Sequence, residues 1–382
     1  MELLNIDDRN GVTSRDIWLQ IKRDELGLIH LKVRAPGPTF TRNQIIEDTE
    51  IGEVGRDIGR NTKLREIFLG GNSSRQFQLL CEGFHENRSI HYVRWDRGRL
   101  QSDMFQSLTP FLESNTNLLG MEFMHCRFDP GGMHSLMAPL MRRGRPLPRL
   151  NLSFNGIDDD LAEELVMGVR ENPALTPKRI HLIGNNISEI GCGLIATLLQ
   201  DPRCTMEELI LIGNRVNDAS AMLFSDALVG NKKLRVLSLG DRAFTATGSR
   251  AMSQLLCDTT NINTTYASNH TLLDLRLTDN IIRSELLQYL GWNRNRNKNR
   301  KMVARQKVFM KHFIENFKME PFEGIHPDLL DRVLDFMNRA SVENGGVTNA
   351  NARHSILYGL IKNNPIVCDI TKPGNDCKRK HV

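Results

Sequence analysis

The sequence predicts an α/β solenoid whose parallel strands line a concave face and whose helices line the opposite, convex face. One short pattern recurs nine times: an aliphatic residue, two others, an aliphatic, one other, an aliphatic, two others and then often Asn. From Leu64 to Leu234, successive copies begin 26 to 30 residues apart. A period near 28 residues indicates units that pack only on their neighbours, so the fold is an array of repeats.

Three copies show the pattern most clearly, and they begin at Leu147, Met206 and Leu272. The full set of starting positions is Leu28, Leu64, Ile90, Leu118, Leu147, Pro177 (a weak match), Met206, Leu234 and Leu272. Repeats of this length and spacing are typical of a leucine-rich repeat horseshoe.

Residues 147–175 show how one repeat is expected to fold. Leu150 and Leu152 alternate as in a short strand with one buried face. Asn155 follows where the chain must turn, and its amide can hydrogen-bond the backbone groups that the turn leaves unpaired. Leu161 and Leu165 then recur at helical spacing. One repeat is therefore a strand, a turn, a helix of about three turns and a return to the next strand.

The pattern LxxLxLxxNxI…G…L…L resembles the ribonuclease-inhibitor subclass of leucine-rich repeat proteins, over about residues 28–285. That subclass includes repeat arrays of nucleotide-binding immune receptors and the Ran GTPase-activating protein. Three departures concern individual repeats. The Asn position is occupied by another residue in four repeats: Pro36, Gly98, Cys126 and Arg242. An aliphatic position is occupied by Trp95. The last repeat begins about ten residues later than the period predicts. Cys126 is a variant that the family tolerates, and we expect it to be a turn residue.

The ends of the array are expected to be helical. Residues 1–27 are predicted to form an N-terminal cap, residues 28–290 the repeats, residues 291–370 a C-terminal helical region, and residues 371–382 a disordered tail. The polar stretch 258–269 lacks an apolar period, which predicts a mobile loop inserted before the last strand.

Composition places the protein among ordinary soluble proteins. Of its 382 residues, 40% are hydrophobic and 25% are charged, and the net charge of +5 does not by itself indicate nucleic acid or membrane binding. No run of 18 apolar residues is present, so no membrane span is expected, and the acidic start predicts no signal peptide. Seven cysteines at wide spacings predict reduced thiols in a cytoplasmic protein, with the nucleus as the alternative compartment.

Motifs for enzyme chemistry are missing from the sequence. It contains no Walker A loop, no GxGxxG, no HExxH, no GxSxG and no Cys/His spacing suited to zinc. His125 and Cys126 are neighbours in an expected strand, so their side chains point to opposite faces and do not pair. We therefore predict no catalytic residue, no cofactor and no metal.

The repeat register predicts which side chains point out of the concave face. The central outward positions of the nine repeats are Lys32, Phe68, Arg94, Glu122, Asn151, His181, Ile210, Ser238 and Arg276. An exposed apolar patch is predicted there, made of Met124, Phe154, Ile183, Ile210 and Ile212 and flanked by Arg149, Arg179 and His181. An apolar centre with an arginine rim is the composition of a protein-binding hot spot.

Charge on this face is predicted to be dipolar. Arginines fall in the first half (Arg94, Arg97, Arg149, Arg179) and acids in the second (Glu208, Asp241, Asp274, Asp279). A dipolar groove orients a protein partner better than it binds a polyanion.

A basic segment follows the repeats: Arg294, Arg296, Lys298, Arg300, Lys301, Arg305, Lys307 and Lys311. It could contact RNA, acidic lipid or an acidic partner, or act as an import signal. Because aromatic residues are not interleaved with it, a solvated helix face is the favoured interpretation.

Three functions remain open. The favoured one is a monomeric, non-enzymatic scaffold that binds another protein, of unknown identity, through the concave face. The resemblance to the Ran activator implies regulation of a small GTPase as an alternative. RNA binding through residues 294–311 is a lesser alternative, because nucleic acid is not the expected partner.

Overall fold

The computed structural model describes residues 19, 22–24, 30–34, 48–70, 74–240, 244–277, 284–295 and 299–315. Its contacts divide the chain into a repeat unit, residues 1–252 with 271–283, and a C-terminal unit, residues 253–270 with 284–382. Most of the expected N-terminal cap, the helices expected beyond residue 315 and the expected disordered tail lie outside the described residues.

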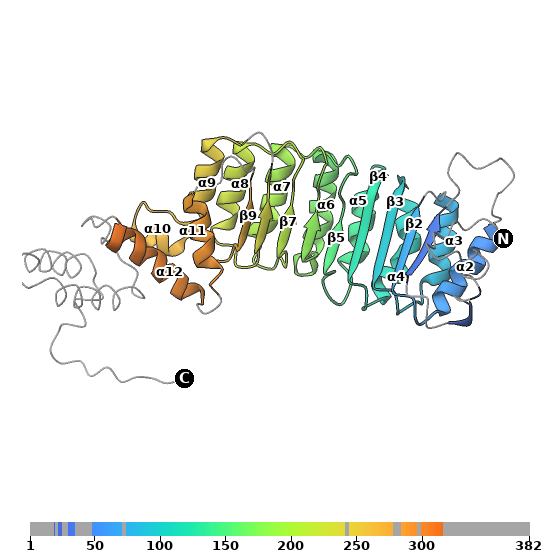
Figure 1. Ribbon diagram of the computed structural model, residues 1–382. Helices are drawn as coiled ribbons and strands as arrows, with labels where there is room; N and C mark the ends of the chain where they lie inside the picture. The colour runs from blue at the N-terminus through green and yellow to red at the C-terminus, as the bar shows by residue number, and fades with distance from the viewer. Residues whose placement is uncertain are drawn as a thin grey trace, which may run out of the picture. The chain divides into compact units, whose positions relative to one another are not determined.

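The described part of the repeat unit contains one parallel sheet of nine strands, paired in chain order (Figure 1). The strands are β1 His30–Arg34, β2 Glu66–Gly70, β3 Tyr92–Leu100, β4 Gly120–Phe128, β5 Arg149–Asn151, β6 Arg179–His181, β7 Glu208–Ile210, β8 Val236–Ser238 and β9 Asp274–Arg276. Their register aligns the second aliphatic residue of every repeat: Leu31, Ile67, Val93, Met121, Leu150, Ile180, Leu209, Leu237 and Leu275. The spacing of the aliphatic residues in the sequence therefore predicted the register of the strands correctly.

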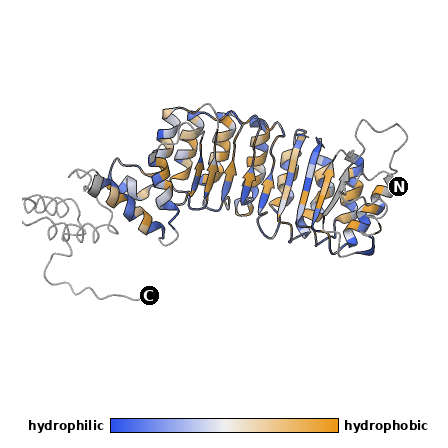
Figure 2. Cartoon of the chain, in the orientation of Figure 1, coloured by the Kyte–Doolittle hydropathy of each residue, from blue (hydrophilic) through white to orange (hydrophobic). Residues whose placement is uncertain are grey.

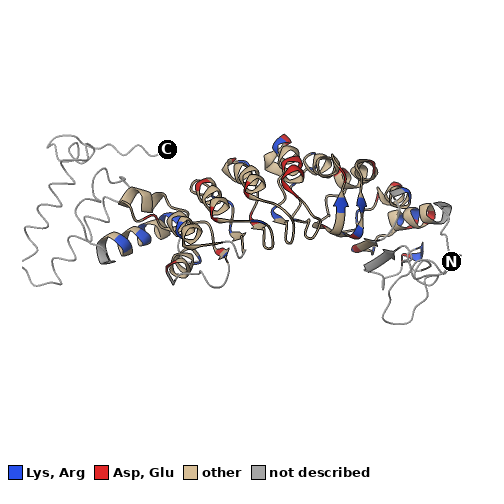
Figure 3. Ribbon diagram, turned by 90° about the horizontal axis from the view of Figure 1, so that it is seen from above, with Lys and Arg blue, Asp and Glu red and all other residues tan. Residues whose placement is uncertain are grey.

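A helix follows each of the first eight strands. These helices are α2 Asp48–Arg60, α3 Ser74–Phe84, α4 Ser102–Ser114, α5 Gly132–Leu140, α6 Asp159–Glu171, α7 Glu189–Gln200, α8 Asp218–Leu228 and α9 Ala246–Leu256. Seen from above, helices line one side of the repeat unit and strands the other (Figure 3). Hydrophobic residues recur along both layers (Figure 2), and Leu150, Leu209 and Leu237 between them are fully buried. The fold is the predicted α/β leucine-rich repeat solenoid.

A ladder of asparagine side chains closes the turns after the short strands. Asn155 donates to the Phe123 carbonyl at 2.9 Å and accepts from the Cys126 amide at 2.8 Å. Asn185 accepts from the amides of Asn155 and Ile157, both at 3.0 Å, and donates to two leucine carbonyls. Asn214 repeats this role one repeat further on. Asn155 thus satisfies backbone groups of the repeat before its own, and Asn185 and Asn214 satisfy backbone groups of their own repeat and of the one before it.

Two repeats without this asparagine continue their strands past the level at which β5 to β9 end. Gly98 and Cys126 occupy the Asn position, and β3 and β4 run on past them to Leu100 and Phe128, in register with each other. The prediction that Cys126 is a turn residue is therefore wrong, since it lies inside β4. Trp95, in an aliphatic position of β3, is buried with its ring centroid 4.5 Å from that of Phe77.

A second asparagine column, which the sequence analysis missed, lies where each helix returns to the next strand. Asn87 donates to the carbonyls of Ile58 and Asn61, and its own oxygen accepts from the Ser89 and Ile90 amides. Further members with the same function are Asn115 and Asn231. These residues stand three positions before a repeat begins, so the signal was present in the sequence.

The C-terminal unit is helical in its described part, with α10 Ile262–Ala267, α11 Ser284–Asn293, α12 Arg300–Val308 and a π-helical stretch Phe309–Glu315. The prediction of a mobile loop over 258–269 is wrong. Asn261 caps α10 by accepting from the Thr264 amide at 2.9 Å, and Ile262 and Thr265 are fully buried. Asn and Thr were interpreted as loop residues, but here they form a helix cap.

The basic segment does not form the exposed stripe that the sequence predicted. Lys307 is fully buried, and its Nζ donates to the carbonyls of Leu256 at 2.5 Å and Asn269 at 3.2 Å. Lys311 is buried with its Nζ 5.1 Å from the ring centroid of Tyr289. Arg294, Arg300 and Lys301 are exposed, Arg305 is half-buried, and Arg296 and Lys298 lie outside the described residues.

The asparagine ladder yields a first prediction. Asn185→Ala leaves two backbone amides and two carbonyls without their side-chain partner, so we expect it to lower the free energy of unfolding by about 2 to 4 kcal/mol. Its exposed neighbour provides the control, since Asn186→Ala should change it by less than about 0.5 kcal/mol. Urea denaturation of both variants measures the difference, and equal midpoints would contradict the ladder's role.

Lys307 yields a prediction on pH. Burial lowers the pKa of Lys307 to about 7, below its ordinary value of 10.5. Between these values the unfolded chain binds more protons than the folded one, so this lysine's contribution to stability rises with pH, by up to about 1.4 kcal/mol per pH unit. In denaturation series between pH 7 and pH 10, the free energy of unfolding of the wild type should therefore increase relative to that of Lys307→Met. Parallel curves would show that Lys307 titrates normally.

Candidate binding face

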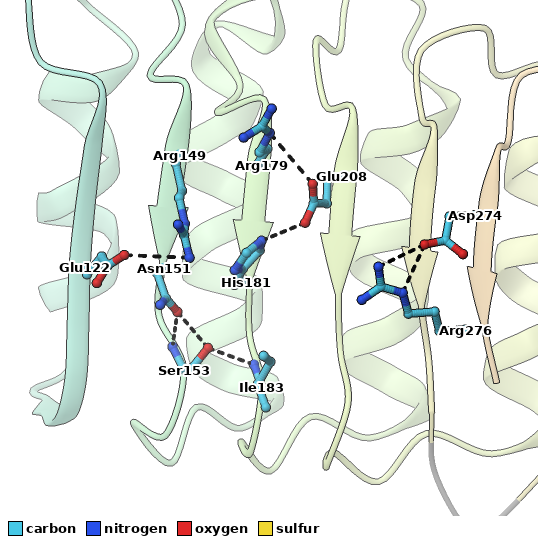
Figure 4. A network of polar contacts seen from close by, with 10 residues as sticks. All are labelled: Glu122, Arg149, Asn151, Ser153, Arg179, His181, Ile183, Glu208, Asp274 and Arg276. Atoms are coloured by element: carbon cyan, nitrogen blue, oxygen red, sulfur yellow. Dashed lines mark hydrogen bonds and ion pairs between the residues drawn. The ribbon is translucent and has the colours of Figure 1, made fainter. Parts of the chain in front are cut away.

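The face of the sheet turned away from the helices, here named the strand face, carries the side chains between the buried aliphatic residues. Figure 4 shows its middle part, from β4 to β9. The strands hold these side chains about 4.8 Å apart from one repeat to the next. Charged and polar groups on adjacent strands therefore meet directly.

Glu122 on β4 lies between two arginines on neighbouring strands. Its carboxylate is 3.6 Å from Arg94 Nε on β3 and 3.7 Å from Arg149 on β5. The Glu122 side chain is 13% exposed, whereas both arginines are about 40% exposed. The carboxylate is thus covered, and the arginines keep part of their surface open to a partner.

Glu208 on β7 makes the equivalent arrangement in the next part of the face. It is 3.7 Å from Arg179 Nε and 2.9 Å from His181 Nε2, both on β6 (Figure 4). Burial and the nearby Arg149 charge lower the pKa of His181, although its hydrogen bond to Glu208 acts in the opposite direction. His181 is therefore neutral at pH 7 and serves as a hydrogen-bonding group.

The predicted dipolar charge separation is wrong for the described residues. Glu122 lies among the arginines of the first half and neutralises part of their charge. In the second half, Asp274 pairs with Arg276 on the same strand at 2.9 Å. The other two acids of the predicted negative half, Asp241 and Asp279, lie outside the described residues. Cross-strand pairing interleaves the two signs of charge.

The five apolar residues predicted for this face differ in exposure. Phe154 is 45% exposed and Ile212 36%, while Met124 and Ile183 are half-buried. Ile210 is only 7% exposed, so its prediction as part of an exposed patch is wrong. Its Cα partners on the adjacent strands are His181 and Ser238.

A polar pair connects the strand face to its apolar part. Asn151 Oδ1 accepts from the amide of Ser153 at 3.1 Å and from its hydroxyl at 2.6 Å. The Ser153 hydroxyl oxygen accepts in turn from the Ile183 amide at 3.2 Å (Figure 4). Both side chains are buried, so this pair fixes the backbone beneath Phe154 and Ile183.

Five residues that directly precede the Asn position have left-handed backbone, and the sequence analysis missed them. They are Arg97, His125, Phe154, Gly184 and Gly213, with φ between 54° and 74°. We name this set the left-handed column. Glycine adopts such angles without strain, whereas the three other residue types do so at an energetic cost. In the sequence, the glycines that directly precede asparagine in two successive repeats, Gly184 and Gly213, were the signal for this left-handed backbone.

Phe154 is an exposed large apolar residue of the column and lies between its two neighbours. Its ring stacks on His125, with centroids 5.4 Å apart and planes 19° apart. On the other side it covers Gly184, where an added Cβ would lie 2.5 Å from the ring. These two contacts therefore hold the Phe154 ring in one position at the edge of the strand face.

Within the described residues, no group of three or more His, Cys, Asp or Glu side chains could hold a metal ion. No described helix is long and apolar enough to cross a membrane.

Comparisons with known proteins add little to this description. No family model matches the chain, and no curated protein matches it. Among solved structures, a chain from the Rad7 and Elc1 complex in yeast aligns with a TM-score of 0.41 and 14% identity, over 72% of this chain and 63% of that one. The actin-binding site 2 of leiomodin-1 aligns with a TM-score of 0.23 and 9% identity, over 77% of this chain and 96% of that one. Both likenesses are too distant to support a functional argument.

Backbone strain at Phe154 yields a prediction. Phe154→Gly and Phe154→Ala both remove the ring, but only glycine relieves the left-handed angle, so we expect the glycine variant to be more stable by about 1 kcal/mol. At Met124, in the regular part of β4, the order should reverse, with alanine more stable by about 0.5 to 1 kcal/mol. Thermal denaturation of the four variants measures both orders. Alanine being favoured at both positions would show that Phe154 is not strained.

Proposed function

We infer that this protein is a non-enzymatic scaffold that binds another protein across its strand face. The observation that carries this inference is the exposure of Phe154 and Ile212 on the same face, beside the half-buried Met124 and Ile183. Arg149 and Arg179, with 40% and 59% of their side chains exposed, border these residues. Aromatic and aliphatic anchors bordered by arginine are the residues that dominate protein–protein binding energy.

The sheet lowers the free-energy cost of binding, because its contact residues are held before a partner arrives. Their backbone amides and carbonyls bond to the adjacent strands, as in the Phe154 amide donating to the Ile183 carbonyl at 2.7 Å. Little backbone entropy is therefore lost in the complex. An acidic or polar rim on the partner would meet the open arginines, while its apolar side chains would cover Phe154 and Ile212.

The state of the cysteines supports a binding role over thiol chemistry. Cys81, Cys126, Cys192, Cys204 and Cys257 are free and buried. Burial raises the pKa of Cys126 and of Cys192 to about 12. Both thiols are therefore protonated at neutral pH, and a protonated thiol is a poor nucleophile.

Several finer predictions belong to this proposal. Helices of eleven to thirteen residues in α6, α7 and α8 support the ribonuclease-inhibitor-like subclass. Free, buried cysteines support a reducing compartment, the cytoplasm or the nucleus. A monomeric state remains a prediction, as do regulation of a small GTPase and RNA binding by the basic segment. Burial of Lys307 and Lys311 removes two cations from a possible RNA contact.

A double substitution tests the proposal. Ile183→Asp with Ile212→Asp places two charges on the strand face at one half-buried and one exposed position, so we expect partner binding to be lost while the fold remains. Ile210 is unsuitable for this purpose, because a buried aspartate there would destabilise the sheet. Affinity capture followed by identification of the bound proteins provides the measurement.

The helix side offers a matched control. Ile190 on α7 is 69% exposed and Met222 on α8 is 50% exposed, so Ile190→Asp with Met222→Asp makes the same chemical change away from the strand face. This control should retain the partners that the first variant loses. Retention of all partners by both variants, each with a wild-type circular dichroism spectrum, would contradict binding through the strand face.

A further inference from the structure

Two of the strands whose repeats lack the ladder asparagine, β3 and β4, extend the strand face beyond the level at which β5 to β9 end. After Gly98 and Cys126, β3 and β4 continue for two more residues each, and Arg99 stands opposite Arg127 in register. We name residues 97–100 with 125–128 the β3–β4 extension. It has no counterpart in the three-residue strands β5 to β9.

Basic side chains dominate this extension. Arg97, Arg99 and Arg127 are exposed, and Arg99 pairs with Asp129 at 2.6 Å. Arg97 and Arg127 make no ion pair with any residue that the structure describes. Lys and Arg are visible on strands of the N-terminal half in Figure 3. Two uncompensated guanidinium groups at the edge of a face are available to an anionic partner.

The left-handed column places an aromatic group beside these arginines. Arg97, His125 and Phe154 occupy it in successive repeats, with φ of 59°, 54° and 61°. The Cys126 amide donates to Asn155 Oδ1 at 2.8 Å, so the extension and the Phe154 turn are joined directly. The Phe154 ring, on strained backbone, is still 45% exposed. Backbone strain of this kind is concentrated at functional sites, where it holds a side chain in place.

We propose that the β3–β4 extension, with His125 and Phe154, docks an acidic extended segment of the partner protein that carries one aromatic or large aliphatic side chain. Carboxylates of that segment pair with Arg97 and Arg127, and its apolar side chain packs on Phe154. This inference rests on the proposed function, since it assigns chemistry to one end of the same binding face.

Charge favours a protein segment over a nucleic acid as the occupant. Five arginines on this part of the face (Arg94, Arg97, Arg99, Arg127 and Arg149) stand among three carboxylates (Asp96, Glu122 and Asp129), a net charge of +2. A polyphosphate strand would meet the interleaved carboxylates at every repeat, whereas a peptide can place its few charges selectively. Apolar groups at Phe154 and Ile212 also suit a peptide.

Binding of a defined peptide tests the proposal. The probe is a fluorescein-labelled peptide of about twelve residues in which Asp and Glu surround a single Trp, and its companion replaces every acid by Asn or Gln. Fluorescence anisotropy with the full chain should show saturable binding of the acidic peptide, weakening with salt, and at least about tenfold weaker binding of the neutral companion. Absence of saturable binding by the acidic peptide would overturn the proposal.

Charge reversal locates the site. Arg97→Glu with Arg127→Glu should weaken acidic-peptide binding at least about tenfold, and Phe154→Gly should weaken it for the Trp peptide more than for its Trp→Ala version. Arg145→Glu with Arg250→Glu changes the net charge equally, at exposed positions away from this edge, and should alter the affinity less than about twofold. Equal losses in the two double variants would mean that net charge alone attracts the peptide, which overturns the proposed site.

Two further outcomes separate this inference from the proposed function. A single-stranded RNA of equal charge that binds more tightly than the peptide, and competes with it, would identify a nucleic-acid site and overturn the inference. The second outcome is that Arg97→Glu/Arg127→Glu captures the same partners as the wild type, while Ile183→Asp/Ile212→Asp loses them. That result would overturn the inference about the β3–β4 extension but would still support the strand face as the binding surface.

Discussion

The structure of the repeat unit depends on one constraint: each strand ends at a turn whose buried amides and carbonyls need partners. Asn155, Asn185 and Asn214 supply them. The Asn155 side chain bonds the repeat before its own, and those of Asn185 and Asn214 bond backbone groups of their own repeat and of the one before. The ladder therefore ends the strands at the same level and also joins one repeat to the next. Because an unpaired buried amide or carbonyl costs about 1 to 3 kcal/mol, the ladder fixes the period as firmly as the leucines fix the register.

The shape of the candidate site follows from where this ladder begins. Gly98 and Cys126 bring no side-chain amide of their own to that level, and β3 and β4 stay paired as far as Leu100 and Phe128, with Asn155 of the next repeat bonding the β4 backbone. The chain still needs a change of direction at that level, and it takes it through a left-handed residue in each repeat. Further along, glycine carries the same angle at Gly184 without strain. The column therefore presents side chains only at Arg97, His125 and Phe154, where glycine is absent from it.

The spacing of aliphatic residues predicted the strand register and the helices well, because the residues of a single repeat determine which aliphatic side chains are buried. Leu31 to Leu275 align as the pattern implies. Contacts between repeats were less predictable. Ile210 was expected to be open, but it is only 7% exposed, and the exposure of a side chain in a sheet depends on adjacent strands that no single repeat contains. Glu122 likewise gained its two arginines from adjacent strands, and this removed the expected charge separation.

Prediction was poorest in the C-terminal unit, where no repeat constrains the packing. The basic segment gave no sign that Lys307 bonds two carbonyls from residues about forty and fifty positions earlier, because a lysine has the same appearance in sequence whether it is solvated or buried. The strand face differs in this respect. Its backbone was fixed by the repeat, so the errors there concerned the exposure and pairing of side chains. Phe154 shows what this rigidity permits: the ladder beneath it and the ring of His125 beside it hold a strained, exposed aromatic residue in one place. A partner can then bind that ring without first having to order it.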